Sequence, residues 1–229
     1  MKFVVVEGLD GSGKSTQLKM LHDYLKQEDI PFRYLHFPRT DSQIYGELIA
    51  RFLRGELGDI NSVNPYLVAL IYAGDRNDAA SMIMRWLTEG FLVIVDRYVY
   101  SNIAYQCAKL TNINEQEKLK RWILDFEYNY NQIPEPDLNI FLDVPFEFTK
   151  KRLLEARSGN DREYLNGKTD IHESNMEFQM EVRNIYIRLS QTEKQLQLID
   201  CSDHENILPP EKVFKKIINK LVEYQVVKI

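Results

Sequence analysis

The stretch "GLDGSGKS", residues 8–15, constrains the fold of this chain more than any other part of the sequence. It fits the pattern G-x-x-x-x-G-K-[ST] directly after the apolar run "FVVV", and Leu18, Leu21 and Leu25 follow it at helical spacing. The glycines allow a loop whose backbone N–H groups point inward and form a nest for phosphate oxygens. We therefore predict a strand–loop–helix unit that binds a nucleoside triphosphate.

Two side chains of this loop have distinct roles in the prediction. Lys14 can reach between the β- and γ-phosphates, and the hydroxyl of Ser15 is placed to hold Mg²⁺. The helix that starts at Lys14 adds its positive N-terminal end. The ATP-binding residues predicted in the loop are Gly8, Leu9, Asp10, Gly11, Ser12, Gly13, Lys14, Ser15 and Thr16.

Apolar runs alternate with helical patterns along the rest of the chain. We expect strands at residues 2–7, 31–37, 91–96, 134–145 and 196–200. Helices are expected at residues 14–29, 41–55, 63–90, 114–130, 146–156, 171–193 and 210–225. This alternation is typical of a parallel sheet covered by helices on both faces. The predicted fold class is α/β: a P-loop NTPase with three layers (α/β/α), a five-stranded parallel sheet and a lid loop.

We expect one domain over residues 1–229, because no repeat or linker divides the chain. Hydrophobic residues at 44% and charged residues at 28% fit a globular protein with an ordinary core. A net charge of −5 argues against a general nucleic-acid partner. No apolar run approaches the ~18 residues of a membrane helix, and Cys107 and Cys201 have no metal-like spacing. We therefore expect a cytoplasmic protein with reduced thiols and no membrane partner.

The phosphate-binding loop alone does not name a reaction, because GTPases, ATPases and kinases all carry it. The chain has no N-K-x-D stretch of the kind that reads guanine in GTPases. The run "FLVIVDRY" ends in Asp-Arg, where a hydrolytic ATPase commonly places Asp-Glu to activate water. These features favour a kinase, and a P-loop ATPase that acts as a switch or partition protein is the alternative from another class.

Three arginines lie where an acceptor phosphate is expected. Arg39 and Arg97 each follow a predicted strand by one or two residues, and Arg76 lies on a predicted helix. Phosphoryl transfer between two polyanions depends on positioning and charge neutralisation, and guanidinium groups match phosphate oxygens bidentately. Each arginine taken alone is also consistent with a surface position. Asp96, at the end of a predicted strand, is a candidate outer-sphere partner of Mg²⁺.

Six segments occur in an order and spacing that resemble thymidylate kinase: "EGLDGSGKST", "FPR", "LIYAGDR", "VDRYVYSNIAYQ", "PDLNIFLDVP" and "DIHE". The resemblance runs from Lys2 to about Asp200, and "DRYVYSNIAYQ" after a P-loop with Asp at its third position is its most specific part. It implies an enzyme of dTTP synthesis that transfers the γ-phosphate of ATP to dTMP, with Mg²⁺, to give dTDP and ADP. It also implies a homodimer.

The resemblance implies a site for the phosphate and sugar of dTMP. Asp10 would lie near the 3′-hydroxyl and the acceptor phosphate, which Arg39 and Arg97 would contact. Tyr105 would pack under the sugar at C2′ and leave little room for a ribose hydroxyl. The implied dTMP-binding residues are Asp10, Phe37, Arg39, Tyr72, Arg76, Arg97, Ser101, Asn102, Tyr105 and Gln106.

The same resemblance assigns the thymine base to residues of two segments, "LIYAGDR" and "VDRYVYSNIAYQ". Tyr72 would stack on the base, and Arg76 would donate to a base carbonyl. Ser101 and Asn102 fall where the family places contacts to the base edge, with Gln106 beside them. Packing in the core is the alternative reading of Tyr72, as it is of Tyr105.

The polar loop at about residues 157–172 resembles the lid that closes over ATP in this family. Some members carry a catalytic arginine in the P-loop, but Gly11 and Ser12 occupy those positions here, so the lid must supply it. Arg162 is the preferred candidate and Arg157 the other one. Arg152 would stack on adenine. The predicted catalytic residues are Asp10, Lys14, Arg39, Arg97, Arg162 and Arg157.

Another nucleoside or nucleotide kinase, such as a deoxynucleoside kinase or a broad nucleoside-monophosphate kinase, is the alternative within the enzyme class. Those proteins share the P-loop, a D-R-x segment and a lid. Arg39 would have no partner if the acceptor were an uncharged nucleoside, so the "FPR" segment favours a monophosphate.

Overall fold

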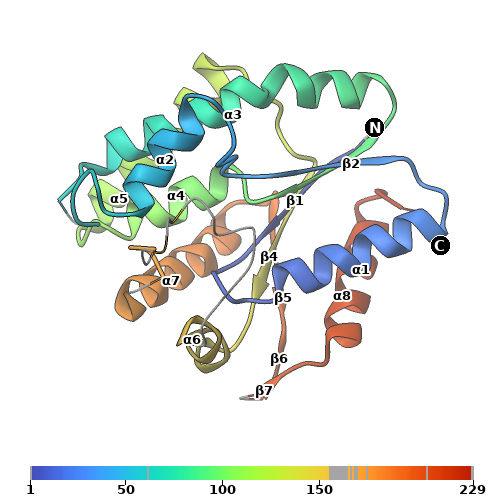
Figure 1. The fold of residues 1–229 in the computed structure, drawn as a ribbon. Coiled ribbons are helices and arrows are strands. Elements are labelled where there is room, and N and C mark those ends of the chain that lie inside the picture. Colours follow the sequence, from blue (N-terminus) through green and yellow to red (C-terminus); the bar gives the residue numbers. More distant parts are fainter. Residues whose placement is uncertain are drawn as a thin grey trace.

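The computed structural model describes residues 2–60, 62–154, 165, 167, 170–173, 175–204 and 206–227. In this part of the chain, five parallel strands form one sheet in the order β2-β3-β1-β4-β5. The strands are β1 (Phe3–Glu7), β2 (Phe32–His36), β3 (Leu92–Asp96), β4 (Leu138–Asp143) and β5 (Leu196–Asp200). Helices cover both faces of the sheet (Figure 1). The predicted α/β class with five parallel strands is confirmed.

The central strand β1 shows why the sheet is buried on both faces. The first four residues of β1, Phe3–Val6, are apolar and mostly β-branched, and their side chains alternate between two hydrophobic clusters. Phe3 and Val5 pack with the cluster of α3, α4, α5 and α7, whereas Val4 and Val6 pack with the cluster of α1 and α8. In Figure 1, α1 and α8 lie together on one side of the sheet.

The helices of the described residues are α1 (Lys14–Gln27), α2 (Tyr45–Leu53), α3 (Pro65–Thr88), α4 (Val99–Cys107), α5 (Ile113–Leu124), α6 (Phe146–Leu154), α7 (Met176–Thr192) and α8 (Pro210–Glu223). A π-helical segment, η1 (Asp125–Tyr130), continues α5. A short hairpin, β6 (Ser202–Asp203) and β7 (Asn206–Ile207), follows β5. Across the part of the chain that is described, no helix is both long and apolar enough to cross a bilayer.

Two helix predictions needed correction. The helix predicted from residue 171 begins only at Met176, because the side chain of Asn175 caps it by accepting from the backbone N–H of Phe178 at 2.9 Å. The helix predicted at residues 114–130 changes to π-helical geometry at Asp125. The helix α4 and the hairpin β6–β7 were not predicted at all.

The pairing register of the parallel strands places their carboxyl ends at one edge of the sheet. Val6 of β1 pairs with Asp96 of β3, and Glu7 pairs with Phe141 of β4. After β1 the chain crosses to β2, which lies beyond β3, and after β3 it crosses to β4, which lies on the other side of β1. The connections that follow β1 and β3 therefore leave in opposite directions. At such a point, open α/β sheets bind ligands in the crevice outside the carboxyl ends of the strands.

Candidate active site

The P-loop joins β1 to α1 with left-handed backbone at Gly11 and Gly13, whose φ angles are +77° and +83°. A side chain is strained in that region, so both positions require glycine. The ammonium group of Lys14 curls back over the loop and donates to the carbonyls of Gly8 and Leu9 at 3.2 and 3.1 Å. Burial, helped by the charge of Arg97, lowers the pKa of Lys14. The loop is thus folded around a buried cation.

A cleft of about 820 Å³ opens beside the P-loop at the carboxyl edge of the sheet. Most of the predicted site residues line it: Asp10, Gly11, Ser12, Gly13, Lys14, Ser15, Thr16, Phe37, Tyr72, Arg76, Asp96, Arg97, Ser101, Asn102, Tyr105, Gln106 and Arg152. Gly8, Leu9 and Arg39 are described but do not line it. Arg157 and Arg162 lie outside the described residues.

Arg97 and Asp10 form the charged centre of the cleft. One guanidinium nitrogen of Arg97 donates to Oδ1 of Asp10 at 2.8 Å, and another donates to the hydroxyl of Ser101 at 3.0 Å. The hydroxyl of Tyr105 donates to Oδ2 of Asp10 at 2.8 Å. Burial alone would raise the pKa of Asp10, but the charges of Arg97 and Lys14 and the hydroxyl of Tyr105 outweigh it, so the pKa is lowered.

The backbone at Arg97 is unusual for a residue other than glycine, because its φ is +65°. Its backbone N–H donates to the carbonyl of Val6 at 3.0 Å, which ties the turn after β3 to the end of β1. A side chain held in the left-handed region marks a position that the surrounding structure has to enforce. The fold therefore aims this guanidinium into the cleft.

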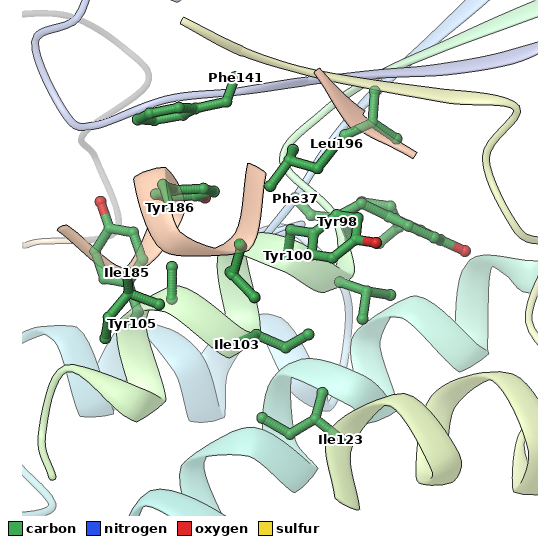
Figure 2. Close-up of a cluster of buried hydrophobic side chains, with 14 of the residues drawn as sticks. Phe37, Tyr98, Tyr100, Ile103, Tyr105, Ile123, Phe141, Ile185, Tyr186 and Leu196 are labelled. Atoms are coloured by element: carbon green, nitrogen blue, oxygen red, sulfur yellow. The ribbon is translucent and has the colours of Figure 1, made fainter. Parts of the chain in front are cut away.

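Glu7 enforces that turn, and the sequence analysis missed it. Its fully buried carboxylate accepts from the backbone N–H groups of Tyr98 and Ser101 at 3.0 and 3.3 Å, and from the hydroxyl of Tyr186 at 2.8 Å. Burial raises its pKa above the usual value. Figure 2 shows Tyr98 and Tyr186 within a cluster of buried hydrophobic side chains. A charged residue ending an otherwise apolar strand was the available signal.

At the end of the cleft assigned to the base, Arg76 pairs with a second carboxylate that sequence reasoning missed. Its Nε and one Nη nitrogen donate to the carboxylate of Glu127 at 2.5 and 2.6 Å. The amide nitrogen of Asn102 donates to the same carboxylate at 3.0 Å. Tyr72 and Gln106 line the cleft as well. Arg76, Asn102, Tyr72 and Gln106 thus line the same cleft, and their contacts to a base stay a prediction.

Arg39 lies apart from this group. Its Nε donates to Oδ1 of Asp75 at 2.8 Å, its backbone N–H donates to Oδ2 of the same carboxylate at 2.9 Å, and an Nη nitrogen donates to Asp78 at 2.6 Å. Both acidic residues belong to α3, so in this structure that helix holds the guanidinium. The role of Arg39 toward an acceptor phosphate stays a prediction.

Ser15 and Asp96 both line the cleft and fit an Mg²⁺ ion carried by a nucleotide. Oδ2 of Asp96 lies 3.2 Å from Nδ1 of His36, while Oδ1 is buried and has no hydrogen-bond partner among the described residues. Burial would raise the pKa of Asp96, but the charge of Lys14 and the contact with His36 lower it. A hydroxyl and an ionised carboxylate are oxygen donors of the kind that Mg²⁺ prefers.

His172 is a further cleft residue with no predicted role. Its ring is stacked on Phe178 at 5.4 Å between centroids and lies 5.0 Å from the ring of Tyr105. Burial, with a smaller contribution from Lys109, lowers its pKa to about 3, so the imidazole is neutral near pH 7. Gln179 of α7 links this segment to the P-loop, because its amide donates to the carbonyl of His172 and to Asp10 at 3.0 and 3.4 Å.

Arg152 is the predicted adenine contact at the other end of the cleft. It is an exposed residue of α6, and its guanidinium carbon lies 5.9 Å from the ring centroid of Phe148. It lines the same cleft as the P-loop. Its stacking on adenine stays a prediction.

Comparison with known proteins identifies relatives that match from 66% to 99% of this chain. The thymidylate kinase family model matches residues 6–210. A probable thymidylate kinase of Methanococcus aeolicus is 34% identical over 227 residues, which are 99% of this chain and 98% of that protein. A probable thymidylate kinase of Pyrococcus horikoshii is 31% identical over 87% of each chain. The thymidylate kinase of Plasmodium falciparum is 34% identical over 66% of this chain and 65% of that protein.

A solved structure agrees with these sequence relatives at the level of the fold. The thymidylate kinase of Candida albicans superposes with a TM-score of 0.70 at 22% identity, covering 98% of this chain and 92% of that one. The residues matched by the family model include the P-loop, the Arg97 turn and the helix α7. On these grounds the chain belongs to the thymidylate kinase family.

Proposed function

We propose that this chain transfers the γ-phosphate of ATP to dTMP, giving dTDP and ADP. The observation that supports this best is the geometry at Arg97. A guanidinium lies in one cleft with the P-loop, held by Asp10 and directed there by a left-handed backbone. Membership of the thymidylate kinase family supports the same reaction. A guanidinium in this place suits an acceptor that carries phosphate.

In the proposed reaction, each half of the cleft binds one polyanion. The P-loop N–H groups and Lys14 hold the phosphates of ATP, and Arg97 holds the phosphate of dTMP. Lys14 leaves its loop carbonyls when phosphate oxygens replace them. The acceptor oxygen then attacks the γ-phosphorus in line and ADP leaves, so the residues act by positioning and by neutralising charge.

Mg²⁺ would be held with ATP by Ser15 and Asp96, and when bound it neutralises charge on the transferred phosphoryl group. The unpartnered Oδ1 of Asp96 is the atom that fits this role. The lid arginine belongs to the same proposal, with Arg162 preferred over Arg157. Arg39 would join the acceptor phosphate only after leaving Asp75 and Asp78.

In this proposal, Tyr105 selects deoxyribose over ribose. Burial raises the pKa of its hydroxyl well above the ordinary value, so the group stays protonated and donates to Asp10. Its ring packs against His172 and Phe178 at centroid distances of 5.0 and 6.0 Å, which leaves it little freedom to move. A fixed ring at C2′ would collide with a ribose hydroxyl.

The test is an ADP-release assay with ATP and Mg²⁺ against dTMP, dUMP, dCMP, dGMP, AMP, UMP and thymidine. We expect a strong preference for dTMP and little ATP turnover when no acceptor is present. Activity on thymidine without activity on dTMP would make the chain a nucleoside kinase. Hydrolysis that is indifferent to every acceptor would favour the P-loop ATPase alternative instead.

We further propose that the chain forms a homodimer through α3. Leu67 and Leu70 of this helix are three residues apart and keep 57% and 37% of their surface exposed. Exposed leucines at helical spacing are typical of a helix that packs against another one. Light scattering on the wild type and on the double variant Leu67→Glu, Leu70→Glu tests this. A monomeric wild type would refute it.

A cytoplasmic location belongs to the proposal too. Cys107 and Cys201 are both buried and unpaired, which suits a reducing compartment. Cell fractionation with an antibody to the chain checks it, and recovery in an oxidising compartment would refute it.

A further inference from the structure

Glu127 lies behind the cleft, on the π-helical segment η1. Its side chain is fully buried, and it does not line the cleft. Its carboxylate nevertheless accepts three hydrogen bonds from two residues that do: two from Arg76 and one from Asn102. Both of these residues are expected to contact the base of the acceptor. One buried carboxylate thus holds two side chains of the base pocket.

The contacts of Asn102 fix the orientation of its amide. The amide nitrogen donates to Glu127 at 3.0 Å and to the backbone carbonyl of Ala69 at 3.1 Å. A carboxylate and a carbonyl only accept hydrogen bonds, so the NH₂ group has to face them. The carbonyl oxygen Oδ1 is buried and finds no partner in the described part of the chain. It is therefore the atom of Asn102 that is left to accept a hydrogen bond from a ligand.

Arg76 complements this acceptor with a donor. Its Nε and one Nη nitrogen are used by Glu127, and the remaining Nη nitrogen makes no hydrogen bond among the described residues, although Arg76 lines the cleft. A guanidinium has only donors and stays protonated. The pocket therefore presents one fixed donor and one fixed acceptor, and both depend on Glu127.

Pyrimidine bases differ in the pattern that such a pair can recognise. Thymine and uracil carry a donor at N3–H beside carbonyl acceptors, whereas cytosine carries an acceptor at N3 and an amino donor next to it. A buried acceptor that faces cytosine N3, and a guanidinium that faces its amino group, would both be left unpaired. Buried groups that lose their partners are costly, and sites built this way discriminate strongly between analogues.

We propose that Glu127 is the positioning residue that makes this pocket select thymine or uracil over cytosine. It acts through Arg76 and Asn102 and touches no substrate itself. This inference rests on the proposed function, because it concerns the acceptor base of the same reaction. In Glu127→Gln a single carbonyl oxygen would have to serve three donors, and the new amide N–H groups would face the donors of Arg76.

The experiment compares steady-state kinetics of the wild type and Glu127→Gln with dTMP, dUMP and dCMP as acceptors. We expect the ratio of kcat/KM for dTMP over dCMP to fall at least tenfold, with most of the change in the KM for dTMP. The KM for ATP should change less than twofold. Glu117→Gln is the matched control, because it removes an exposed carboxylate that pairs with Lys120 at 3.0 Å. It should leave every value within twofold of the wild type.

A merely structural role for Glu127 would lower the rates with dTMP and dCMP by the same factor, and that outcome would overturn the proposal. If Glu127→Gln does not fold, Asn102→Ala tests the same pocket while keeping the pair of Arg76 and Glu127. It too should lower the dTMP-over-dCMP ratio at least tenfold, and an unchanged ratio would overturn the proposal. A wild type inactive on dTMP would refute the proposed function itself.

Discussion

The two buried arginines of the cleft meet their carboxylates in different settings. The side chains of Arg76 and Glu127 are 2% and 0% exposed and share two hydrogen bonds. Those of Arg97 and Asp10 are 10% and 25% exposed and share one contact at 2.8 Å. Asp10 also accepts from Tyr105 and, more distantly, from Gln179. The end of the cleft assigned to the base thus carries a closed ion pair, and the end assigned to the acceptor phosphate carries one that is open to the cleft.

The difference indicates which of the two arginines can exchange its carboxylate partner for a substrate group. Removing one partner of a closed, dry pair leaves an uncompensated charge, so Arg76 and Glu127 stay together through the reaction. Arg97 can turn from Asp10 to a phosphate without leaving the carboxylate unpaired, because Tyr105 remains bonded to it. Under the proposed function, the base would therefore be read by a rigid surface, and the phosphate would be held by a movable cation.

The largest expected effect comes from breaking the closed pair. Arg76→Met leaves Glu127 buried without its partner, so we expect the free energy of unfolding to fall by about 3–5 kcal/mol. Urea denaturation of the purified protein measures it. The double variant Arg76→Met, Glu127→Leu should regain most of the loss, because no charge remains buried. A loss below about 1 kcal/mol in the single variant would remove the contrast between the two pairs.

The second prediction breaks the open pair. Arg97→Ala should cost at least ~3 kcal/mol of transition-state stabilisation, a fall of about a hundredfold or more in kcat. Its unfolding free energy should fall less than that of Arg76→Met, since Asp10 keeps other donors and some exposure to solvent. Arg33→Ala is the control, because this exposed arginine of β2 lies over the ring of Phe91, outside the cleft. Unchanged turnover in Arg97→Ala would exclude the residue from the mechanism.

The sequence was sufficient for the sheet but not for every helix. The strands β1 and β3 are short, β-branched runs whose burial on both faces follows from their composition. The helix α4 escaped prediction because eight of its nine residues are buried, so it has no polar face and no helical period to detect. The π-helical turn of η1 has no comparable pattern in the sequence.

Within the cleft, local patterns predicted more than long-range contacts did. The P-loop and Arg97 follow from strand ends and glycine spacing, which are local. Glu7 and Glu127 act on residues 91 and 51 positions away, so no local pattern indicates their roles. The orientation of Arg39 depends on Asp75, which lies 36 positions away and would compete with an acceptor phosphate for the guanidinium. Such competition is decided by tertiary structure alone.

The third prediction sharpens the comparison through pH. The pKa of His172 is lowered to about 3 by burial and, to a smaller extent, by Lys109, against about 6.5 in an unfolded chain. The unfolded state therefore binds more protons below pH 6.5, and stability should fall as the pH drops from 6.5 toward 3, by about 3 kcal/mol at pH 4. Urea titrations at pH 7, 5.5 and 4 measure this slope.

His172→Phe is the matched variant for that slope. It keeps a flat ring against Phe178 and Tyr105 but removes the titrating nitrogen. Its stability should depend less steeply on pH over the same window than that of the wild type. An equal dependence of unfolding free energy on pH in the two proteins would show that the imidazole of His172 is not held neutral in the folded state.

The smallest effect is expected from removing the hydroxyl of Tyr105. It tests whether Asp10 keeps enough hydrogen-bond donors when one of them is lost. Tyr105→Phe removes one hydrogen bond to Asp10 but keeps the ring, while Arg97 still donates to the same carboxylate at 2.8 Å. We expect kcat/KM for dTMP to fall about fivefold, or ~1 kcal/mol, as for one lost hydrogen bond. The preference for dUMP over UMP should persist, because the ring remains at C2′. A loss as large as that of Arg97→Ala would mean that the hydroxyl alone positions Asp10, and the open pair would then be as constrained as the closed one.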